Sequence, residues 1–297
     1  MATVLLPNGN RHLSRIGGVA LFLVACVAYT QTQPAAAALK VQKLKDNLYW
    51  IEGDGSNTTM RVTNEGVILV EDKHESTYPA LLAAIKTVTP QPVKYIFTTH
   101  YHEDHSGGNS KFLGTAQIIS TVNTRTAIVN HKAPNSRPIG PNFTPAQIAF
   151  TEEMSVFLGG AEVRGHYFGR GHTNGDAVVY FPDLKAVAMG DLMSGENPGI
   201  DYLNGGSMVE LIKTYDKLLA AYDFDIVVPG HGAVTNRAGL KTYRDNIVKL
   251  MDRARTFLRQ GKKTEDDLSK FMEKEYGWAI GSTRQVQNIP GMIKELQ

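Results

Sequence analysis

The sequence predicts an α/β protein in which strands and helices form a layered sandwich, with loops gathered at one rim. Three observations support this class. Short apolar runs typical of strands alternate with amphipathic helical patterns, the alternation occurs in two similar halves, and the polar residues best suited to chemistry directly follow predicted strands. The chain shows no internal repeat of solenoid period, so a single layered fold is the expectation.

The composition is that of an ordinary globular protein. The 297 residues are 42% hydrophobic and 20% charged, which excludes a disordered, collagen-like or coiled-coil chain. The formal charge is +2, and without Arg11 and Arg15 the chain has 29 basic and 29 acidic residues. A near-neutral body has no general electrostatic attraction for nucleic acid or anionic lipid. We therefore expect no nucleic-acid partner, and the sequence does not indicate an oligomeric state.

Residues 1–38 have the pattern of a signal peptide, with a basic start, an apolar run over 16–29 and small residues over 34–38. The apolar run of about 14 residues is shorter than the roughly 20 that a membrane span needs, so cleavage is expected. We favour release of a periplasmic or secreted protein; the alternative is a lipoprotein signal with a lipid anchor through Cys26. Cys26 is the only cysteine, so neither route leaves a disulfide. Residues 39–297 are then expected to form one domain without a membrane span.

The first half of this domain begins with strands and continues with helices between strands. Two apolar runs predict strands over 41–51 and 58–70, the second interrupted by a turn at 64–66. A helical pattern over 78–88 ends before Pro90 and Pro92, and a strand follows over 95–99. Further along we expect helices over 109–113 and 122–129, a strand over 117–120, and an irregular Pro/Asn-rich loop over 131–145.

The second half predicts another sheet covered by helices. Its strands are expected over 162–168, 177–181, 186–189 and 226–228, with Gly-rich turns between the first three. An amphipathic helix is expected over 208–221, and helices over 237–259 and 265–275 close the chain.

The most informative segment of the chain is a histidine cluster that directly follows the predicted strand over 95–99. His100 and His102 are two residues apart at the strand end, so they project to the same side and can bind one metal ion. Asp104 and His105 lie on the next turn and can face a second metal. Four potential ligands within six residues after an apolar strand strongly indicate a metal site.

Three further candidate ligands stand at turns beside predicted strands, namely His172, Asp191 and His231. Imidazoles and carboxylates in this proportion suit Zn²⁺, and the carboxylates are also compatible with iron or manganese. Asp191 is placed to bridge two metal ions.

With these residues the chain resembles the metallo-β-lactamase-fold superfamily, over roughly residues 40–260. The resemblance lies in the His-x-His-x-Asp-His pattern followed by a His, an Asp and a His. It implies a four-layer αββα sandwich with the metal site at one rim of the two sheets. By position, His100, His102 and His172 would hold the first Zn²⁺; Asp104, His105 and His231 would hold the second, and Asp191 would bridge them. Asp72 fits an earlier acidic motif whose carboxylate steadies the histidine loop; the alternative is a strand-end turn residue.

One departure from the family pattern bears on the substrate. The β-lactamases that use a thiolate ligand have Cys where this chain has Asp191, and residues 193–207 contain no Lys or Arg to bind an antibiotic carboxylate. Arg164 or Arg170 could supply that charge.

Other polar residues receive simpler interpretations. We expect Tyr101 in the core and His74, His131 and His166 as surface or packed groups, and Asp176 either binds the ligand loop or starts a strand.

The expected activity is that of an exported dinuclear zinc hydrolase acting on a small carbonyl substrate, with β-lactam opening as the named candidate. Two cations would lower the pKa of a shared water, and Asp104 would orient that water and transfer its proton. A lactone or thioester hydrolase of the glyoxalase II type is the alternative within this class. A mononuclear iron oxidoreductase resembling the persulfide dioxygenases, with His100, His172 and Asp191 as ligands, is an alternative of another class. A binding module without catalysis is a third.

Overall fold

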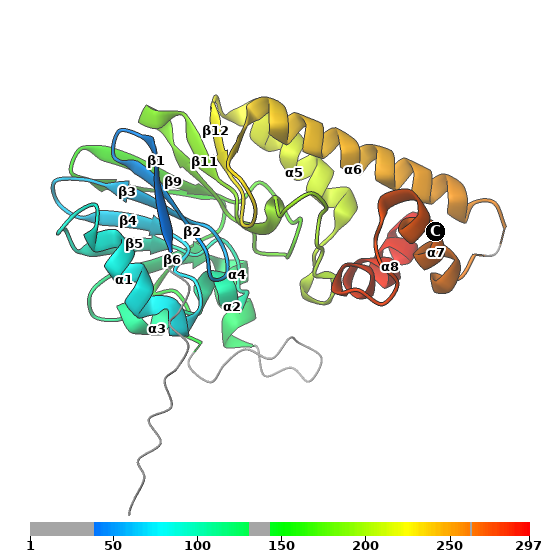
Figure 1. The fold of residues 1–297 in the computed structure, drawn as a ribbon, viewed down its shortest axis with the longest axis horizontal. Helices are drawn as coiled ribbons and strands as arrows, with labels where there is room; N and C mark the ends of the chain where they lie inside the picture. The colour runs from blue at the N-terminus through cyan, green and yellow to red at the C-terminus, as the bar shows by residue number, and fades with distance from the viewer. Residues whose placement is uncertain (1–38, 131–142, 262) are drawn as a thin grey trace, which may run out of the picture. The chain divides into compact units, whose positions relative to one another are not determined.

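Two β-sheets face each other in the computed structural model, which describes residues 39–130, 143–261 and 263–297 (Figure 1). The α/β class predicted from the sequence is confirmed. The predicted signal segment 1–38, with both of its processing alternatives, lies outside the described residues, as does most of the loop expected over 131–145.

The first sheet has seven strands in sequence order. Neighbouring strands are antiparallel from β1 to β4 and parallel from β4 to β7. The parallel pairs require crossovers, which the short helices of the first half supply. The strands are β1 (Lys40–Lys45), β2 (Leu48–Glu52), β3 (Thr58–Val62), β4 (Val67–Val70), β5 (Val93–Phe97), β6 (Gln117–Thr121) and β7 (Ile148–Phe150).

The second sheet has six strands in the order β13-β12-β11-β10-β9-β8. Only β11 and β12 pair in parallel, and α5 connects them. The strands are β8 (Glu153–Leu158), β9 (Ala161–His166), β10 (Val178–Phe181), β11 (Ala186–Ala188), β12 (Ile226–Val228) and β13 (Thr235–Asn236).

Alternation along the strands builds four layers. In β4, Ile68 and Val70 enter the core between the sheets, whereas Val67 and Leu69 pack toward α1 and α3. In β10, Val179 enters the same inter-sheet core, and its neighbours face α5 and α6. Helices therefore cover the outer face of each sheet, as Figure 1 shows. The helices are α1 (Tyr78–Lys86), α2 (Glu103–Ser106), α3 (Asn109–Phe112), α4 (Val122–Val129), α5 (Met208–Ala221), α6 (Arg237–Leu258), α7 (Glu265–Tyr276) and α8 (Thr283–Leu296).

Two expectations about regular structure were wrong. The strand expected over 41–51 is two antiparallel strands, because Asn47 takes a left-handed conformation with φ of 60° and turns the chain. The helix expected over 265–275 does not close the chain, since α8 follows it. Pro290 and Gly291, both poor helix formers, lie inside α8. Strands β7 and β8 are further additions to the elements that the sequence predicts.

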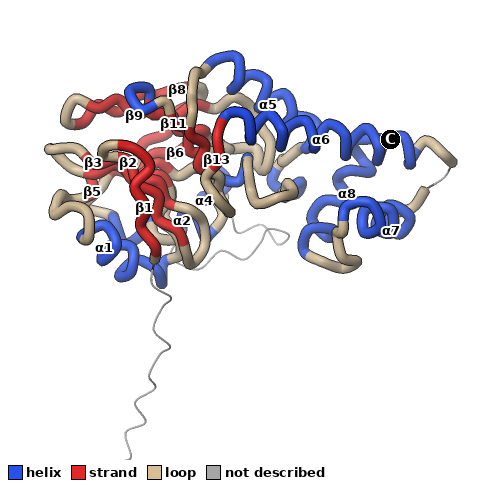
Figure 2. Tube along the Cα trace, turned by 45° about the horizontal axis from the view of Figure 1, so that its top comes forward, coloured by secondary structure: helices blue, strands red, loops and turns tan. Residues whose placement is uncertain are grey.

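Helix α8 is held in place by tertiary contacts. It packs with α6 and α7, and the three helices lie together in both views (Figures 1 and 2). A Cβ added at Gly291 would overlap the ring of Tyr202, so glycine permits the close approach of this tyrosine. The Tyr202 hydroxyl donates a hydrogen bond to Glu295 of the same helix at 3.0 Å.

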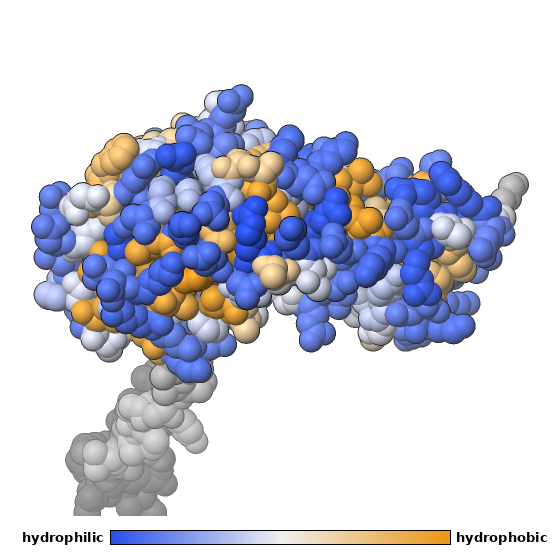
Figure 3. All heavy atoms as spheres, turned by 90° about the horizontal axis from the view of Figure 1, so that it is seen from above, coloured by the Kyte–Doolittle hydropathy of each residue, from blue (hydrophilic) through white to orange (hydrophobic). Residues whose placement is uncertain are grey.

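Among the helices of residues 39–130, 143–261 and 263–297, none combines the length and the apolar character that crossing a bilayer demands. Hydrophilic residues cover most of the face seen in Figure 3, and hydrophobic residues gather in smaller areas between them.

Gly291→Ala tests the docking of α8. Helix propensity alone would make alanine stabilising by about 1 kcal/mol. We expect the opposite, a loss of about 1 to 3 kcal/mol in the free energy of unfolding, because the methyl group must displace the Tyr202 ring. Urea denaturation measures it, with Lys270→Ala at an exposed position of α7 as the control. Equal or greater stability of Gly291→Ala would contradict this packing.

Candidate metal centre

The candidate ligands line or adjoin one cavity of about 410 Å³. Five of them come after a strand: His100 and His102 follow β5, His172 follows β9, Asp191 follows β11, and His231 follows β12, whereas Asp104 and His105 lie on α2. The two sheets therefore supply the two sides of the site through their connecting loops. Thr283, Arg284 and Gln287 from the start of α8 also line the cavity.

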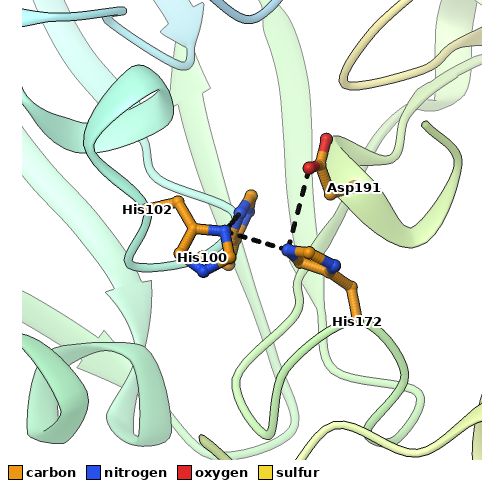
Figure 4. Close-up of side chains that lie close together, drawn as sticks. All are labelled: His100, His102, His172 and Asp191. Carbon is orange, nitrogen blue, oxygen red and sulfur yellow. Dashed lines mark hydrogen bonds and ion pairs between the residues drawn. The ribbon is translucent and has the colours of Figure 1, made fainter. Parts of the chain in front are cut away.

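Three imidazoles form the first group. The His102 Nδ1 atom lies 3.0 Å from His100 Nε2 and 2.9 Å from His172 Nε2. Figure 4 shows these rings pointing toward one another, with Asp191 beside His172. One ligand atom from each of the four residues lies within 4.8 Å of every other, close enough to share a metal ion.

In His172 and His102 one ring nitrogen faces away from the other histidines and forms a hydrogen bond. That bond determines whether the nitrogen facing the other histidines carries a proton or a free lone pair. His172 donates from Nδ1 to the carbonyl oxygen of Gly199 at 2.6 Å, which leaves its Nε2 unprotonated in the neutral ring. His102 Nε2 lies 3.2 Å from the Asp201 carboxylate and donates its proton to it. The Nδ1 atom of His102 is therefore unprotonated and carries a free lone pair. Two lone pairs 2.9 Å apart repel each other unless a cation lies between them. The donor set therefore fits a metal ion.

Asp104, His105 and His231 form the second group. Asp104 Oδ2 lies 3.0 Å from His231 Nε2 and 3.5 Å from His105 Nε2, and the two imidazole nitrogens are 3.3 Å apart. His105 is fully buried, whereas the Asp104 side chain keeps 22% of its surface exposed toward the cavity. Asp104 is thus the carboxylate of this group that a small molecule can reach.

Asp191 connects the two groups. Its Oδ2 lies 3.7 Å from His172 Nε2 of the first group. Its Oδ1 lies 3.4 Å from both His105 Nε2 and His231 Nε2 of the second. This Oδ1 is buried and has no hydrogen-bond partner among the described residues. A buried carboxylate oxygen without a donor is costly, and a shared cation would satisfy it.

Burial and neighbouring charges set the protonation of these groups. Burial lowers the pKa of His172 to about 4, although Asp191 opposes this shift. Burial also holds the pKa of His100 well below its usual value. Burial would raise the pKa of Asp191 and of Asp104, but the positive charge of the protonated His105 beside them lowers both well below the ordinary range. Burial would lower the pKa of His105, but Asp191 and Asp104 raise it well above its usual value, so a metal ion has to displace a proton from this ring. The neutral imidazoles of His100 and His172 and the ionised carboxylates are already in the forms that bind metal ions.

The loop that carries the first histidines is held from behind by Asp72, which is completely buried. Its Oδ1 accepts from the Gly108 backbone N–H at 3.0 Å, and its own N–H donates to the His105 carbonyl at 3.1 Å. A Cβ at Gly107 would overlap the Glu103 carbonyl, and one at Gly108 would crowd Asp72, so both positions favour glycine. Asp72 therefore contacts the histidine loop as the sequence analysis expects.

The His172 loop has a similar support in Asp176. This buried carboxylate accepts from the backbone N–H groups of Gly171 and Thr173, at 3.1 and 2.9 Å from its Oδ2. Burial raises the pKa of Asp176 to about 7. Of the two roles left open from the sequence, binding of the ligand loop is the one that the structure shows.

Two residues that contact the ligands are absent from those predicted from the sequence, namely Glu71 and Asp201. Glu71 Oε1 lies 3.5 Å from His105 Nδ1, on the side of the ring away from the cavity. Asp201 contacts His102 and accepts a hydrogen bond from the hydroxyl of Tyr101. Tyr101 is buried as expected, but it also helps to hold this carboxylate. For Glu71 the available signal was its place at the end of the apolar β4 strand; for Asp201 the sequence offers none.

The cation at the cavity is Arg284, which the sequence analysis did not consider. Neither Arg164 nor Arg170 lines the metal cavity: Arg164 pairs with Glu162 on β9, and Arg170 lines an adjoining one. Within 39–130, 143–261 and 263–297, no carboxylate forms an ion pair with Arg284. His74, interpreted as a surface or packed group, also lines the metal cavity.

The chain is similar in sequence to a known protein family and to several of its members. A family described as the metallo-beta-lactamase superfamily matches residues 52–231. The chain is 28% identical to metallo-beta-lactamase IND-1 of Chryseobacterium indologenes over 180 residues, 59% of this chain and 71% of the relative. It is 27% identical to the type 2 metallo-beta-lactamase of Elizabethkingia meningoseptica over 226 residues, 72% and 85% of the two chains. A hydroxyacylglutathione hydrolase of Crocosphaera subtropica is 26% identical over 182 residues, 60% and 62% of the two chains.

Solved structures show the same fold. A metallo-beta-lactamase from Pontibacter korlensis superposes with a TM-score of 0.61 at 23% identity, covering 71% of this chain and 99% of that one. At this identity the likeness concerns the fold alone, and it agrees with the four layers described above.

Metal removal should destabilise the protein, because a metal that binds only the folded state stabilises it. Zinc at about 100 times its dissociation constant contributes about 2.7 kcal/mol. We expect a chelator to lower the Tm of the zinc-loaded protein by about 5 to 10 °C. The loss of Tm on adding chelator should be smaller in His102→Ala, which removes a ligand of the first group and leaves Asp104, His105 and His231 in place. In His166→Ala, a control that removes a histidine paired with Glu153 outside the cavity, it should persist. A wild-type Tm that chelator leaves unchanged would contradict the metal site.

Asp201→Asn tests the support of His102. We expect the zinc affinity to fall about 10- to 100-fold, the usual effect of removing a carboxylate that orients a histidine ligand. Competition with a chromophoric chelator measures the affinity. Asp216→Asn, which breaks an exposed ion pair with Arg244, is the matched control. Equal affinities of the two variants would show that Asp201 does not orient the ligand.

Proposed function

Because this chain belongs to the metallo-beta-lactamase superfamily, we propose that it is an exported, metal-dependent hydrolase of a small carbonyl substrate. The observation that carries this proposal is the convergence of two ligand groups beside one accessible cavity, joined by the two oxygens of Asp191. The export component is supported by the sequence pattern of residues 1–38, and the mass of the mature protein in a periplasmic extract tests it.

The residues present suit two Zn²⁺ ions, with iron or manganese as alternatives because two of the ligands are carboxylates. His100, His102 and His172 would hold one ion; Asp104, His105 and His231 would hold the other; Asp191 would contribute to both. Such ions, when bound, supply Lewis-acid activation of a carbonyl and lower the pKa of coordinated water.

The protein's own groups position the reactants. The Asp104 carboxylate is ionised and faces the cavity, so it can orient an attacking water and accept its proton. The Arg284 guanidinium, which lines the same cavity, can attract an anionic group of the substrate. Asp72 and Asp176, which bind the ligand loops, keep the reacting groups in fixed positions.

β-Lactam ring opening is the first substrate candidate. The names of two relatives at 27% and 28% identity support it, and export would place the enzyme where such compounds arrive. Arg284 supplies a positive charge that residues 193–207 lack.

Lactone or thioester hydrolysis is the second candidate. It is favoured by Asp191, which occupies the position of the lactamase thiolate and faces both ligand groups. The relative named hydroxyacylglutathione hydrolase agrees with it. A mononuclear iron oxidoreductase would need only the first group, so the close approach of Asp104, His105 and His231 argues for hydrolysis.

Two measurements on metal-reconstituted protein test the proposal. Elemental analysis should find about two zinc ions per chain, whereas one iron would support the oxidoreductase. A hydrolysis panel of β-lactams, lactones and thioesters should then reveal turnover in at least one class. No turnover across the panel, or a single iron per chain, would overturn the proposed function.

Asp104→Asn should leave the fold intact and reduce kcat about 10²- to 10⁴-fold on any substrate that the panel identifies, the usual contribution of a positioned acid-base group. Circular dichroism and Tm check the fold, and steady-state kinetics measure kcat. Asp223→Asn, which removes an exposed partner of Lys185, is the control. Turnover close to wild type in Asp104→Asn would remove this carboxylate from the mechanism.

A further inference from the structure

A second cavity of about 730 Å³ adjoins the metal cavity. The two share His102, Thr283 and Gln287 in their walls, so they meet at these three side chains. One side of the second cavity is the loop over 200–206 and the other is α8. We call this cavity the α8 groove.

The α8 groove carries exposed apolar side chains from both of its walls. Leu203 of the loop is 78% exposed and Val286 of α8 is 66% exposed. Single exposed hydrophobic residues are common on protein surfaces, but here two face one groove beside the candidate active site. Pro290 and Tyr202 add further apolar surface, and the charged side chains of Arg170, Asp201, Lys294 and Glu295 also line the groove. The exposed apolar side chains of these walls suit the apolar part of a ligand.

Hydrogen bonds hold the two walls of the groove together. The buried side chain of Asn288 on α8 accepts from the Ile200 N–H at 3.0 Å and donates to the Pro198 carbonyl at 3.1 Å. The same loop is tied to the metal centre, because the Asp201 N–H donates to the His172 carbonyl at 2.7 Å. The groove is therefore preformed and fixed relative to the candidate ligands.

We propose that the α8 groove binds an extended apolar acyl chain of the substrate while its carbonyl lies at the metal centre. The inference rests on the proposed function and adds the substrate class, an acyl compound with a medium-length apolar chain. Helix α8 lies beyond residues 52–231 that match the family, so this wall is an addition to the shared fold. The three wall residues that the groove shares with the metal cavity favour a small-molecule chain as the occupant, because one end of such a chain would lie beside the candidate ligands.

Straight-chain carboxylates from acetate to octanoate are suitable probes, because they bind without being hydrolysed. Isothermal titration calorimetry on the purified full chain should show affinity rising at least about tenfold from butanoate to octanoate as methylenes enter the groove. Leu203→Gln and Val286→Gln should each reduce this dependence on chain length, since a neutral polar side chain removes apolar surface without repelling the probe. The control is Phe157→Gln on β8, which alters a side chain of similar exposure, 71%, outside both cavities.

Kinetics provide the second readout on whichever ester, lactone or thioester series the enzyme hydrolyses. In wild type, kcat/KM should increase as the acyl chain of the substrate becomes longer. In Leu203→Gln and in Val286→Gln, the ratio of kcat/KM for a long chain to that for a short chain should be about tenfold smaller. Equal affinity for butanoate and octanoate, or an equal loss in Phe157→Gln, would overturn the groove proposal. Length-dependent binding that the two groove variants reduce, without any hydrolysis, would uphold the groove and overturn only the proposed hydrolase function.

Discussion

The mutual repulsion of lone pairs in a buried cluster is the constraint on which the rest of this structure depends. His102 and His172 each use the outer ring nitrogen as a donor, to Asp201 and to Gly199, and so present unprotonated nitrogens to each other. Ionised Asp191 adds an oxygen that no donor satisfies among the described residues. Such a cluster is unfavourable by itself and favourable around cations. The surrounding loops must therefore be fixed by other interactions, which the buried carboxylates Asp72 and Asp176 provide.

Strand ends made the ligand positions predictable from sequence. A polar residue directly after an apolar strand must lie near a sheet edge, and two packed sheets bring their edges together, so short local patterns were enough to nominate the seven candidate ligands. Most strands follow from short apolar runs, and most helices follow from apolar residues at helical spacing. The class of fold and the convergence of His100, His172 and His231 are thus properties of local sequence combined with simple packing rules.

What the sequence did not reveal depends on contacts between distant segments. Asp201 is 99 residues from the His102 side chain that it orients, and no periodicity marks it. Arg284 lies on α8, a helix that contains Pro290 and Gly291 and is held by packing against Tyr202 and by Asn288. Local propensity argues against a helix there, and tertiary contacts override it. The expectation that Arg164 or Arg170 supplies the positive charge at the metal cavity was wrong, since Arg284 lines it instead. Cavity walls are formed by segments that only the fold brings together, so local sequence did not reveal this residue.

The division between shared fold and added helices has a consequence for specificity. Ligand loops tied to strand ends can change little, because Asp72 binds the histidine loop, Asp176 binds the His172 loop, and His172 itself donates to a backbone carbonyl. The wall formed by α8 has no such restriction at its solvent-facing positions, where Val286 is exposed and Arg284 has no ion-pair partner in the described part of the chain. Substrate preference can therefore vary through α8 while the metal chemistry stays constant. Recognition in this protein is accordingly best sought on the helix farthest along the chain from the histidine cluster.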